Sequence, residues 1–169
     1  DWAFNGCSSL TSITIPESVT SIVGEGWAFY GCSSLTSIKV EEGNTKYDSR
    51  NNCNAVIETA TNTLIIGCKN TIIPEGVTSI GICAFSGCSG LTSITIPESV
   101  TNINRYAFYG CSGLTDVHCF AKEIPQTDSD TFKNTPIKKA PLHVPAASVE
   151  KYKAASPWSG FGKIVAIEE

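Results

Sequence analysis

Apolar and polar residues alternate in a short pattern that recurs along most of the chain. Within residues 91–97 (LTSITIP), Ile94 and Ile96 occupy alternate positions and polar side chains separate them. Successive side chains of a strand point to opposite faces, so this pattern predicts a short strand with its isoleucines inward, ended by the proline. Val100 and Ile103 follow three residues apart. They predict a second apolar-lined segment on the opposite wall.

The same pattern returns with a period of 23 residues. The segment AFSGCSGLTSI at 84–94 recurs as AFYGCSGLTDV at 107–117, and further copies begin at Ala3 and Ala28. A unit this short cannot bury its own apolar face, so the repetition predicts copies stacked on one another. The repeated phenylalanine predicts a continuous aromatic spine, whose members are Phe4, Phe29, Phe85, Phe108 and Phe132.

The period is interrupted twice. The turn at 23–26 adds two residues to the first period, and the interval from Phe29 to Phe85 exceeds two periods by ten residues. Within that interval, two β-rich runs flank the turn 59–62, which predicts a β-hairpin in residues 47–68. Pairing centred on this turn sets Ile57 opposite Leu64. It also sets Cys53 opposite Cys68, which leaves a disulfide and two free thiols as alternatives.

After residue 120 the repeat decays, as in a capping unit. Residues 140–145 predict a last strand, and residues 148–155 predict a short helix with Ser148 as its N-cap and Pro157 beyond its end. Four apolar residues are expected to cover the end of the core: Trp158, Phe161, Ile164 and Val165. We expect one domain over 1–169, made of N-terminal repeats (1–46), the hairpin insertion (47–68), further repeats (69–120) and a cap (121–169).

Composition narrows the function classes. Hydrophobic residues make up 41% and charged residues 17%, which excludes a disordered chain. The formal charge is −4 and no run of Lys or Arg forms a phosphate-binding stripe, so no nucleic-acid partner is expected. No apolar run approaches the roughly 18 residues that span a bilayer. The chain lacks Met and opens partway through a repeat, and we interpret it as a fragment or processed form whose targeting signal lay upstream.

Four of the eight cysteines, Cys7, Cys32, Cys88 and Cys111, share one repeat position. Such a position normally points inward, where a free thiol serves as a small hydrophobe. Each stacked repeat forms one rung of the predicted coil, and neighbouring rungs lie about 4.8 Å apart. Cysteine Cβ atoms on neighbouring rungs are then farther apart than the roughly 3.8 Å of a disulfide. We expect reduced, buried thiols in this ladder.

Candidate chemistry is sparse. His118 and His143 are the only histidines, and repeat alignment places both on the outward strand face, in a row with Thr14, Lys39, Ile72 and Thr95. A metal site normally needs three or four ligands and only Asp116 is an obvious third. Two solvated histidines, with no metal and no cofactor, are therefore expected.

No catalytic arrangement is indicated, because the serines occupy repeat positions and neither histidine lies in a motif. Glu17, Glu75 and Glu98 share one repeat position, which favours a solvated edge. The row of Trp2, Trp27 and Tyr106 predicts packing, with ligand contact as the alternative. We therefore expect a non-enzymatic protein.

The recurring GCSxLTSIxIPxxVTxI and Ala-Phe motifs closely resemble the BspA-type leucine-rich repeat family over residues 1 to 120. The hairpin at 47–68 and the segments LHVP at 142–145 and VEKYK at 149–153 are also similar to that family. The resemblance implies a β-rich solenoid, a right-handed leucine-rich-repeat coil with a hairpin insertion and a C-terminal cap. It also implies an extracellular or bacterial cell-surface location and adhesion to host proteins or other cells. It supplies no binding residues.

Identical rungs give a partner no unique register, so a contact surface is expected where the chain departs from the repeat. These residues are Glu25 and Trp27 in the long turn, Lys39 on the strand face, and Tyr47, Asp48 and Arg50 before the hairpin. The alternative is that the hairpin only shields the interrupted core. For the whole chain, the expected function is protein interaction with a host-matrix or cell-surface protein, and the alternative is a structural spacer. The oligomeric state is left open.

Overall fold

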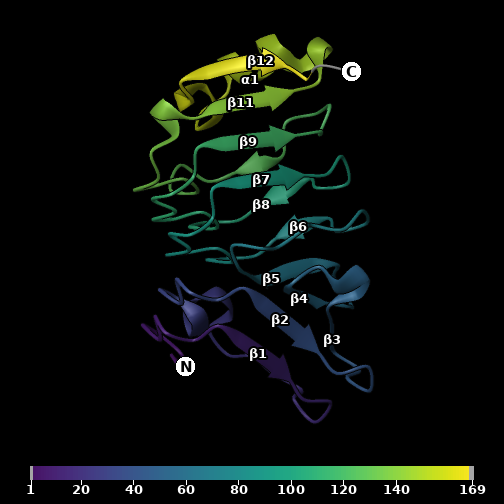
Figure 1. Ribbon diagram of the computed structural model, residues 1–169. Coiled ribbons are helices and arrows are strands. Elements are labelled where there is room, and N and C mark those ends of the chain that lie inside the picture. Colours follow the sequence, from purple (N-terminus) through teal and green to yellow (C-terminus); the bar gives the residue numbers. More distant parts are fainter. Residues whose placement is uncertain (1, 168–169) are drawn as a thin grey trace.

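The computed structural model describes residues 2–167. Short strands lie side by side along the length of the molecule, with β1 at one end and β12 at the other (Figure 1). One wall carries a two-stranded parallel sheet and a four-stranded parallel sheet of order β7-β9-β11-β12. Their strands are β1 (Ser12–Ile15), β2 (Ser37–Val40), β7 (Ser93–Ile96), β9 (Asp116–Cys119), β11 (Pro141–Val144) and β12 (Lys163–Ala166).

A six-stranded sheet of order β10-β8-β6-β5-β4-β3 contains the second wall and the hairpin. Its strands are β3 (Tyr47–Asp48), β4 (Ala55–Glu58), β5 (Thr63–Gly67), β6 (Ser79–Ile80), β8 (Asn102–Ile103) and β10 (Gln126–Thr127). One α-helix, α1 (Val149–Ala154), lies near the C-terminal end, and among the described residues no helix is long and apolar enough to cross a membrane. The remaining helical turns are η1 (Glu25–Phe29), η2 (Arg50–Asn52), η3 (Ile137–Lys139), η4 (Ala146–Ser148) and η5 (Trp158–Gly160).

The alternating pattern forms strands as predicted. In β7 the two isoleucines are buried and Ser93 and Thr95 are exposed. Ser93 pairs with Asp116 of β9, 23 residues on, whereas Ser12 of β1 pairs with Ser37 of β2, 25 residues on. The longer turn at 23–26 therefore lengthens the loop between strands without shifting their faces. Val100 and Ile103 are buried along the second wall, as expected.

The hairpin insertion is part of the second wall. β4 and β5 pair antiparallel, and β5 continues the wall by pairing parallel with β6. Ile57 faces Leu64 as predicted, but a bulge between Val56 and Ile57 shifts the register beyond it, so that Ala55 faces Gly67. A bulge inserts one unpaired residue into a strand. The predicted opposition of two cysteines is therefore wrong.

Cys53 and Cys68 are both buried free thiols. The Cys53 Sγ lies 3.9 Å from the carbonyl oxygen of Ala55, and the Cys68 Sγ lies 3.5 Å from that of Asn54. The two thiols belong to different core clusters. Of the two alternatives, the structure has free thiols.

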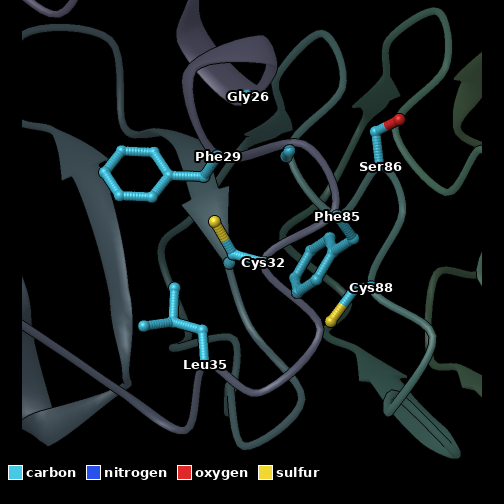
Figure 2. A pocket seen from close by; sticks show the side chains of 9 residues that line it. Gly26, Phe29, Cys32, Leu35, Phe85, Ser86 and Cys88 are labelled. Atoms are coloured by element: carbon cyan, nitrogen blue, oxygen red, sulfur yellow. The ribbon is translucent and has the colours of Figure 1, made fainter. Parts of the chain in front are cut away.

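The aromatic spine is interrupted. Phe4 stacks on Phe29 with ring centroids 5.0 Å apart, and Phe108 stacks between Phe85 and Phe132 at 5.1 and 5.5 Å. Among the described residues no ring contact joins Phe29 to Phe85. The hairpin fills the interval between their rungs, and both rings border a cavity of only about 10 Å³ that Cys32 also lines (Figure 2). A continuous spine was therefore a wrong expectation.

The cysteine ladder is buried with one exception. Cys32, Cys88 and Cys111 are buried free thiols, and burial raises the pKa of Cys88 to about 12 and that of Cys111 well above its ordinary value. The Cys111 thiol donates to the carbonyl oxygen of Phe85 at 3.2 Å. Cys7 is exposed, contrary to expectation, because within residues 2–167 its rung has a neighbouring rung on one side only. The buried thiols thus stay protonated at neutral pH.

The C-terminal segment covers the core. Trp158 is fully buried and Phe161 is 6% exposed, and both contact Phe132 with ring centroids 5.3 and 5.2 Å apart. Ile164 is half-buried, whereas Val165 is 36% exposed and belongs to the outer face. The predicted helix forms, but Ser148 makes no side-chain capping bond. Its hydroxyl instead donates to the carbonyl oxygen of Lys122 at 2.7 Å, which ties the helix to the preceding rung.

The predicted outer row divides into two parts. Thr14 pairs with Lys39 in the two-stranded sheet, and Thr95, His118 and His143 are consecutive partners in the four-stranded sheet. Ile72 is in no strand and is 74% exposed. Its backbone N–H donates to the carbonyl oxygen of Cys53 at 3.0 Å, so the hairpin takes the place of a rung in this row.

Candidate functional site

A surface depression of about 280 Å³ lies where β2 passes into the hairpin. We call it the hairpin depression. It gathers four of the six residues expected to form a contact surface, namely Lys39, Tyr47, Asp48 and Arg50. Its other walls come from the turn after β2 and from η2: Val40, Glu41, Glu42, Asn44, Ser49, Asn51 and Asn52. Residues that depart from the repeat therefore converge in space.

Side-chain hydrogen bonds fix the walls of the hairpin depression. Asn44 donates through Nδ2 to the carbonyl oxygens of Pro16 and Val19, both at 2.9 Å, and its Oδ1 accepts the backbone N–H groups of Lys46 and Tyr47 at 2.9 Å. One asparagine thus joins the turn to the first repeat. On the other side, the Ser49 Oγ accepts the backbone N–H of Val40 at 2.9 Å.

Arg50 and Asp48 form a two-point ion pair. The Arg50 Nη2 lies 2.6 Å from Asp48 Oδ2 and its Nε lies 2.8 Å from Oδ1, while Nη1 donates to Asn62 Oδ1 at 3.0 Å. Hydrogen bonding to Asp48 raises the pKa of Arg50. Both side chains are about 30% exposed, so the pair presents a fixed, neutral, planar surface. The exposed charges are those of Lys39, Glu41 and Glu42.

Tyr47 forms part of the floor. It is 6% exposed, and its hydroxyl oxygen accepts the backbone N–H of Ile22 at 3.1 Å. The ring therefore packs in the core and supports the hairpin depression from below. Tyr47 was expected to contact a partner together with Asp48 and Arg50, and the sequence pattern does not show that its ring faces inward.

Glu25 and Trp27 belong to η1 and do not line the hairpin depression. The side chain of Glu25 lies outside the described residues. Trp27 is half-buried and stacks on Trp2 with ring centroids 5.8 Å apart. The predicted contact residues thus fall into two separate groups.

Trp27 is part of an aromatic cluster that only partly follows from the sequence. Its ring centroid lies 5.7 Å from that of Tyr30 and 6.0 Å from that of Tyr106, and Tyr109 lies 5.5 Å from Tyr106. Arg105 covers the Tyr106 ring at 4.6 Å. The signal for the two missed tyrosines is their shared repeat position directly after Phe29 and Phe108.

Small residues bring this cluster together. Tyr30 and Tyr109 occupy the repeat position of Ser86, which is 5% exposed, and their ring centroids are 6.4 Å apart. Cys83 holds the corresponding place in the row of Trp27 and Tyr106 and is fully buried. Because the intervening rung carries the small side chains of Cys83 and Ser86, aromatic residues of the two flanking rungs contact each other across it.

Arg105, which covers the Tyr106 ring, is paired with an acidic side chain. Its Nη2 lies 2.8 Å from Asp130 Oδ2, and this hydrogen bond lowers the pKa of the Asp130 carboxyl.

The glutamates that share one repeat position, Glu17, Glu75 and Glu98, are exposed, and Glu98 pairs with Lys122 at 2.9 Å. These carboxylates are solvated, as expected.

The two histidines are neighbours, as the repeat alignment predicts. His118 and His143 stack with ring centroids 4.2 Å apart and an interplanar angle of 5°. Asp116 contacts both: its Oδ2 lies 3.0 Å from the Nε2 of His118 and its Oδ1 lies 3.1 Å from the Nε2 of His143. The three side chains therefore form one cluster, which is more than a pair of solvated rings.

The chain belongs to the family described as BspA type leucine rich repeat region, whose repeat matches in six copies over residues 1–63 and 62–153. The resemblance seen in the sequence motifs is thus confirmed. No curated protein matches the chain.

Two solved structures show the same leucine-rich-repeat fold. A leucine-rich repeat protein from Eubacterium ventriosum has a TM-score of 0.63 and 24% identity, covering 94% of this chain and 42% of its own. A leucine rich cell surface protein from Faecalibacterium prausnitzii has a TM-score of 0.59 and 24% identity, covering 95% of this chain and 48% of its own. The chain therefore spans less than half the length of either protein.

Proposed function

We propose that the chain is a non-enzymatic protein-interaction module of a bacterial cell-surface or secreted protein. In this proposal it coils as a right-handed solenoid of 23-residue repeats and binds a host-matrix or cell-surface protein through the hairpin depression. The observation that carries the proposal is the convergence of Lys39, Asp48 and Arg50 in one depression. The Faecalibacterium prausnitzii protein is described as a cell surface protein, which supports an extracellular location for this chain.

The chemistry of the hairpin depression suits a protein partner. The planar Arg50–Asp48 pair is held at both carboxylate oxygens, so a partner that packs on it meets little loss of side-chain entropy. Lys39, Glu41 and Glu42 form a rim of mixed charge, which provides orientation and discrimination between partners. A preformed surface of this kind is typical of a docking site.

The test is direct binding of the full chain to a panel of purified extracellular-matrix and cell-surface proteins. Lys39→Glu reverses an exposed charge within the hairpin depression, and Lys163→Glu makes the same change on exposed β12 at the far end. We expect the wild type and Lys163→Glu to bind equally. Lys39→Glu should lose roughly tenfold or more in affinity, as for removal of a hot-spot contact.

A second variant, Asp48→Asn/Arg50→Gln, removes both charges of the ion pair and keeps a polar side chain at each position. Tyr47→Ala is a poorer choice because Tyr47 accepts the backbone N–H of Ile22, so its loss affects stability as well as binding. Equal binding by Lys39→Glu and Lys163→Glu would place the contact elsewhere. Binding by neither the wild type nor any variant would favour the structural spacer, which the small polar side chains of β7 also suit.

A further inference from the structure

Two imidazoles and one carboxylate face one another on the outer side of the four-stranded sheet. Asp116 and His118 lie two residues apart on β9 and share a face, and His143 is the partner of His118 on β11. One ligand atom from each residue lies within 4.8 Å of the others. We propose that Asp116, His118 and His143 form a binding site for a divalent transition-metal ion of the Zn²⁺ class. This site lies outside the hairpin depression and does not depend on the proposed partner.

The geometry fits such an ion. Ligand atoms about 2.1 Å from a tetrahedral Zn²⁺ lie roughly 3.4 Å from one another, close to the 3.0 and 3.1 Å between the carboxylate oxygens and the two Nε2 atoms. The strand register holds the two rings almost parallel. The lone pairs of stacked rings run side by side, so the two rings have to tilt toward each other for both Nε2 atoms to bind one ion.

The donor set selects the class of ion. Imidazole nitrogen suits Zn²⁺, Ni²⁺ and Cu²⁺, whereas Mg²⁺ and Ca²⁺ prefer oxygen ligands throughout. Three protein ligands leave at least one coordination position open. The three side chains are between 27% and 37% exposed, so water or a side chain of another protein can reach that position.

One oxygen of the Asp116 carboxylate has no hydrogen-bond donor within residues 2–167. Among the described residues, Asp116 Oδ1 is shielded from solvent and receives no hydrogen bond of good geometry, although the Nε2 of His143 is 3.1 Å away. A buried oxygen without a partner is costly, and a cation would satisfy it. In the metal-free chain, the Nε2 of His118 lies 3.0 Å from Oδ2 and donates to it in the tautomer that carries its proton on Nε2. Metal binding places the ion on Nε2, and the neutral ring then carries its proton on Nδ1.

The direct partners of the three ligands in the strand register are uncharged. Thr95 is the partner of His118 on one side, Val165 is the partner of His143 on the other, and Ser93 is the partner of Asp116. The positive charge of Lys163, the partner of Pro141, lies on β12, the strand beside His143. An incoming cation therefore meets the negative charge of Asp116 first among the ligands and their direct partners.

Nuclear magnetic resonance of the imidazole rings tests the proposal directly, because the chain has only two histidines. Zn²⁺ is titrated into a Cys7→Ser background, since Cys7 is the exposed thiol and would compete for the ion. We expect both rings to shift together, to saturate at one ion per chain, and to show Nε2 coordination with the proton on Nδ1. Absence of any shift at millimolar Zn²⁺ would overturn the proposal.

Ligand variants provide the second measurement. Asp116→Asn, His118→Gln and His143→Gln should each weaken Zn²⁺ binding by roughly tenfold or more, with circular dichroism showing that the fold persists. Asp128→Asn is the matched control, because Asp128 is a similarly exposed aspartate away from the site. Unchanged affinity in Asp116→Asn would show that the ion binds elsewhere and would also refute the site.

Discussion

At the scale of single residues, the core depends on aromatic rings that each contact two rungs. Phe108 is fully buried and stacks on both Phe85 and Phe132. Among the described rings, Phe29 stacks only on Phe4, which is itself 36% exposed. Phenylalanines at the same repeat position therefore contribute differently to the free energy of unfolding on different rungs.

We predict that Phe108→Ala lowers the free energy of unfolding by about 3–5 kcal/mol, as for other buried aromatic truncations. Thr95→Ala, on the exposed face of β7, should change it by no more than about 0.5 kcal/mol. Urea unfolding followed by circular dichroism measures both. Comparable losses for the two variants would contradict an energetic role for the stacked rings.

The same scale explains why the candidate sites are only partly predictable. Lys39, Asp48 and Arg50 can be identified from the sequence because they depart from the repeat and lie close to one another along the chain. The contact between Tyr30 and Tyr109 spans residues 79 apart and depends on the small Ser86 between them. Such a contact requires knowledge of the order of the rungs in space. It therefore follows from the fold and not from a motif.

At the scale of elements, period-two alternation predicts β7 and β9 well because each strand has one buried and one solvated face. The hairpin is harder. Its turn and the Ile57–Leu64 pair follow from symmetry about residues 59–62, but the bulge at Val56 leaves no mark in the pattern. A shift of one residue changes every pair beyond it, which is why the cysteine pairing was wrong.

The hairpin also requires a glycine where it meets the repeats. A Cβ atom at Gly67 would collide with the ring of Phe85, which is buried and stacked against Phe108. The Gly67 N–H donates to the carbonyl oxygen of Ala84 at 2.8 Å, so the backbone of β5 cannot move away without losing this bond. Gly67 therefore fixes the distance between the hairpin and the following repeats.

We predict that Gly67→Ala destabilises the chain by about 1–3 kcal/mol, the usual cost of overpacking. Gly160→Ala is the matched control, because its Cβ would meet only the movable end of the Ile137 side chain, at 3.1 Å. Thermal and urea unfolding of both variants provide the comparison. Equal stability of Gly67→Ala and the wild type would show that Phe85 can move at little cost.

At the scale of the whole molecule, the two ends of the stack are unequally covered. The C-terminal end is closed by Tyr152 and Trp158, both fully buried. At the other end β1 pairs only with β2, and a largely apolar hollow of about 390 Å³ is bordered by Phe4, Ile13, Ile15, Val19 and Ile22, among others. The buried residues divide into two clusters, one on each side of the hairpin.

The stability of a repeat array is approximately the sum of the intrinsic stabilities of its repeats and of the interfaces between neighbours. The N-terminal repeats have fewer such interfaces, so we predict that they open before the rest. In hydrogen exchange followed by mass spectrometry, amides of β1 and β2 should exchange through local opening, well below the global free energy of unfolding. Amides of β7, β9 and β11 should approach the global value.

Trp158→Ala gives this prediction a directional control. The substitution removes a fully buried ring that contacts Phe132, Tyr152 and Phe161, so it should speed exchange in β11 and β12 and leave β1 unchanged. If β1 were as strongly protected as β9, or if Trp158→Ala accelerated exchange equally at both ends, the chain would unfold as one cooperative unit. Preferential opening at β1 would instead mean that the hairpin couples the two core clusters only weakly. A partner bound at the hairpin depression would then stabilise the N-terminal repeats against this local opening.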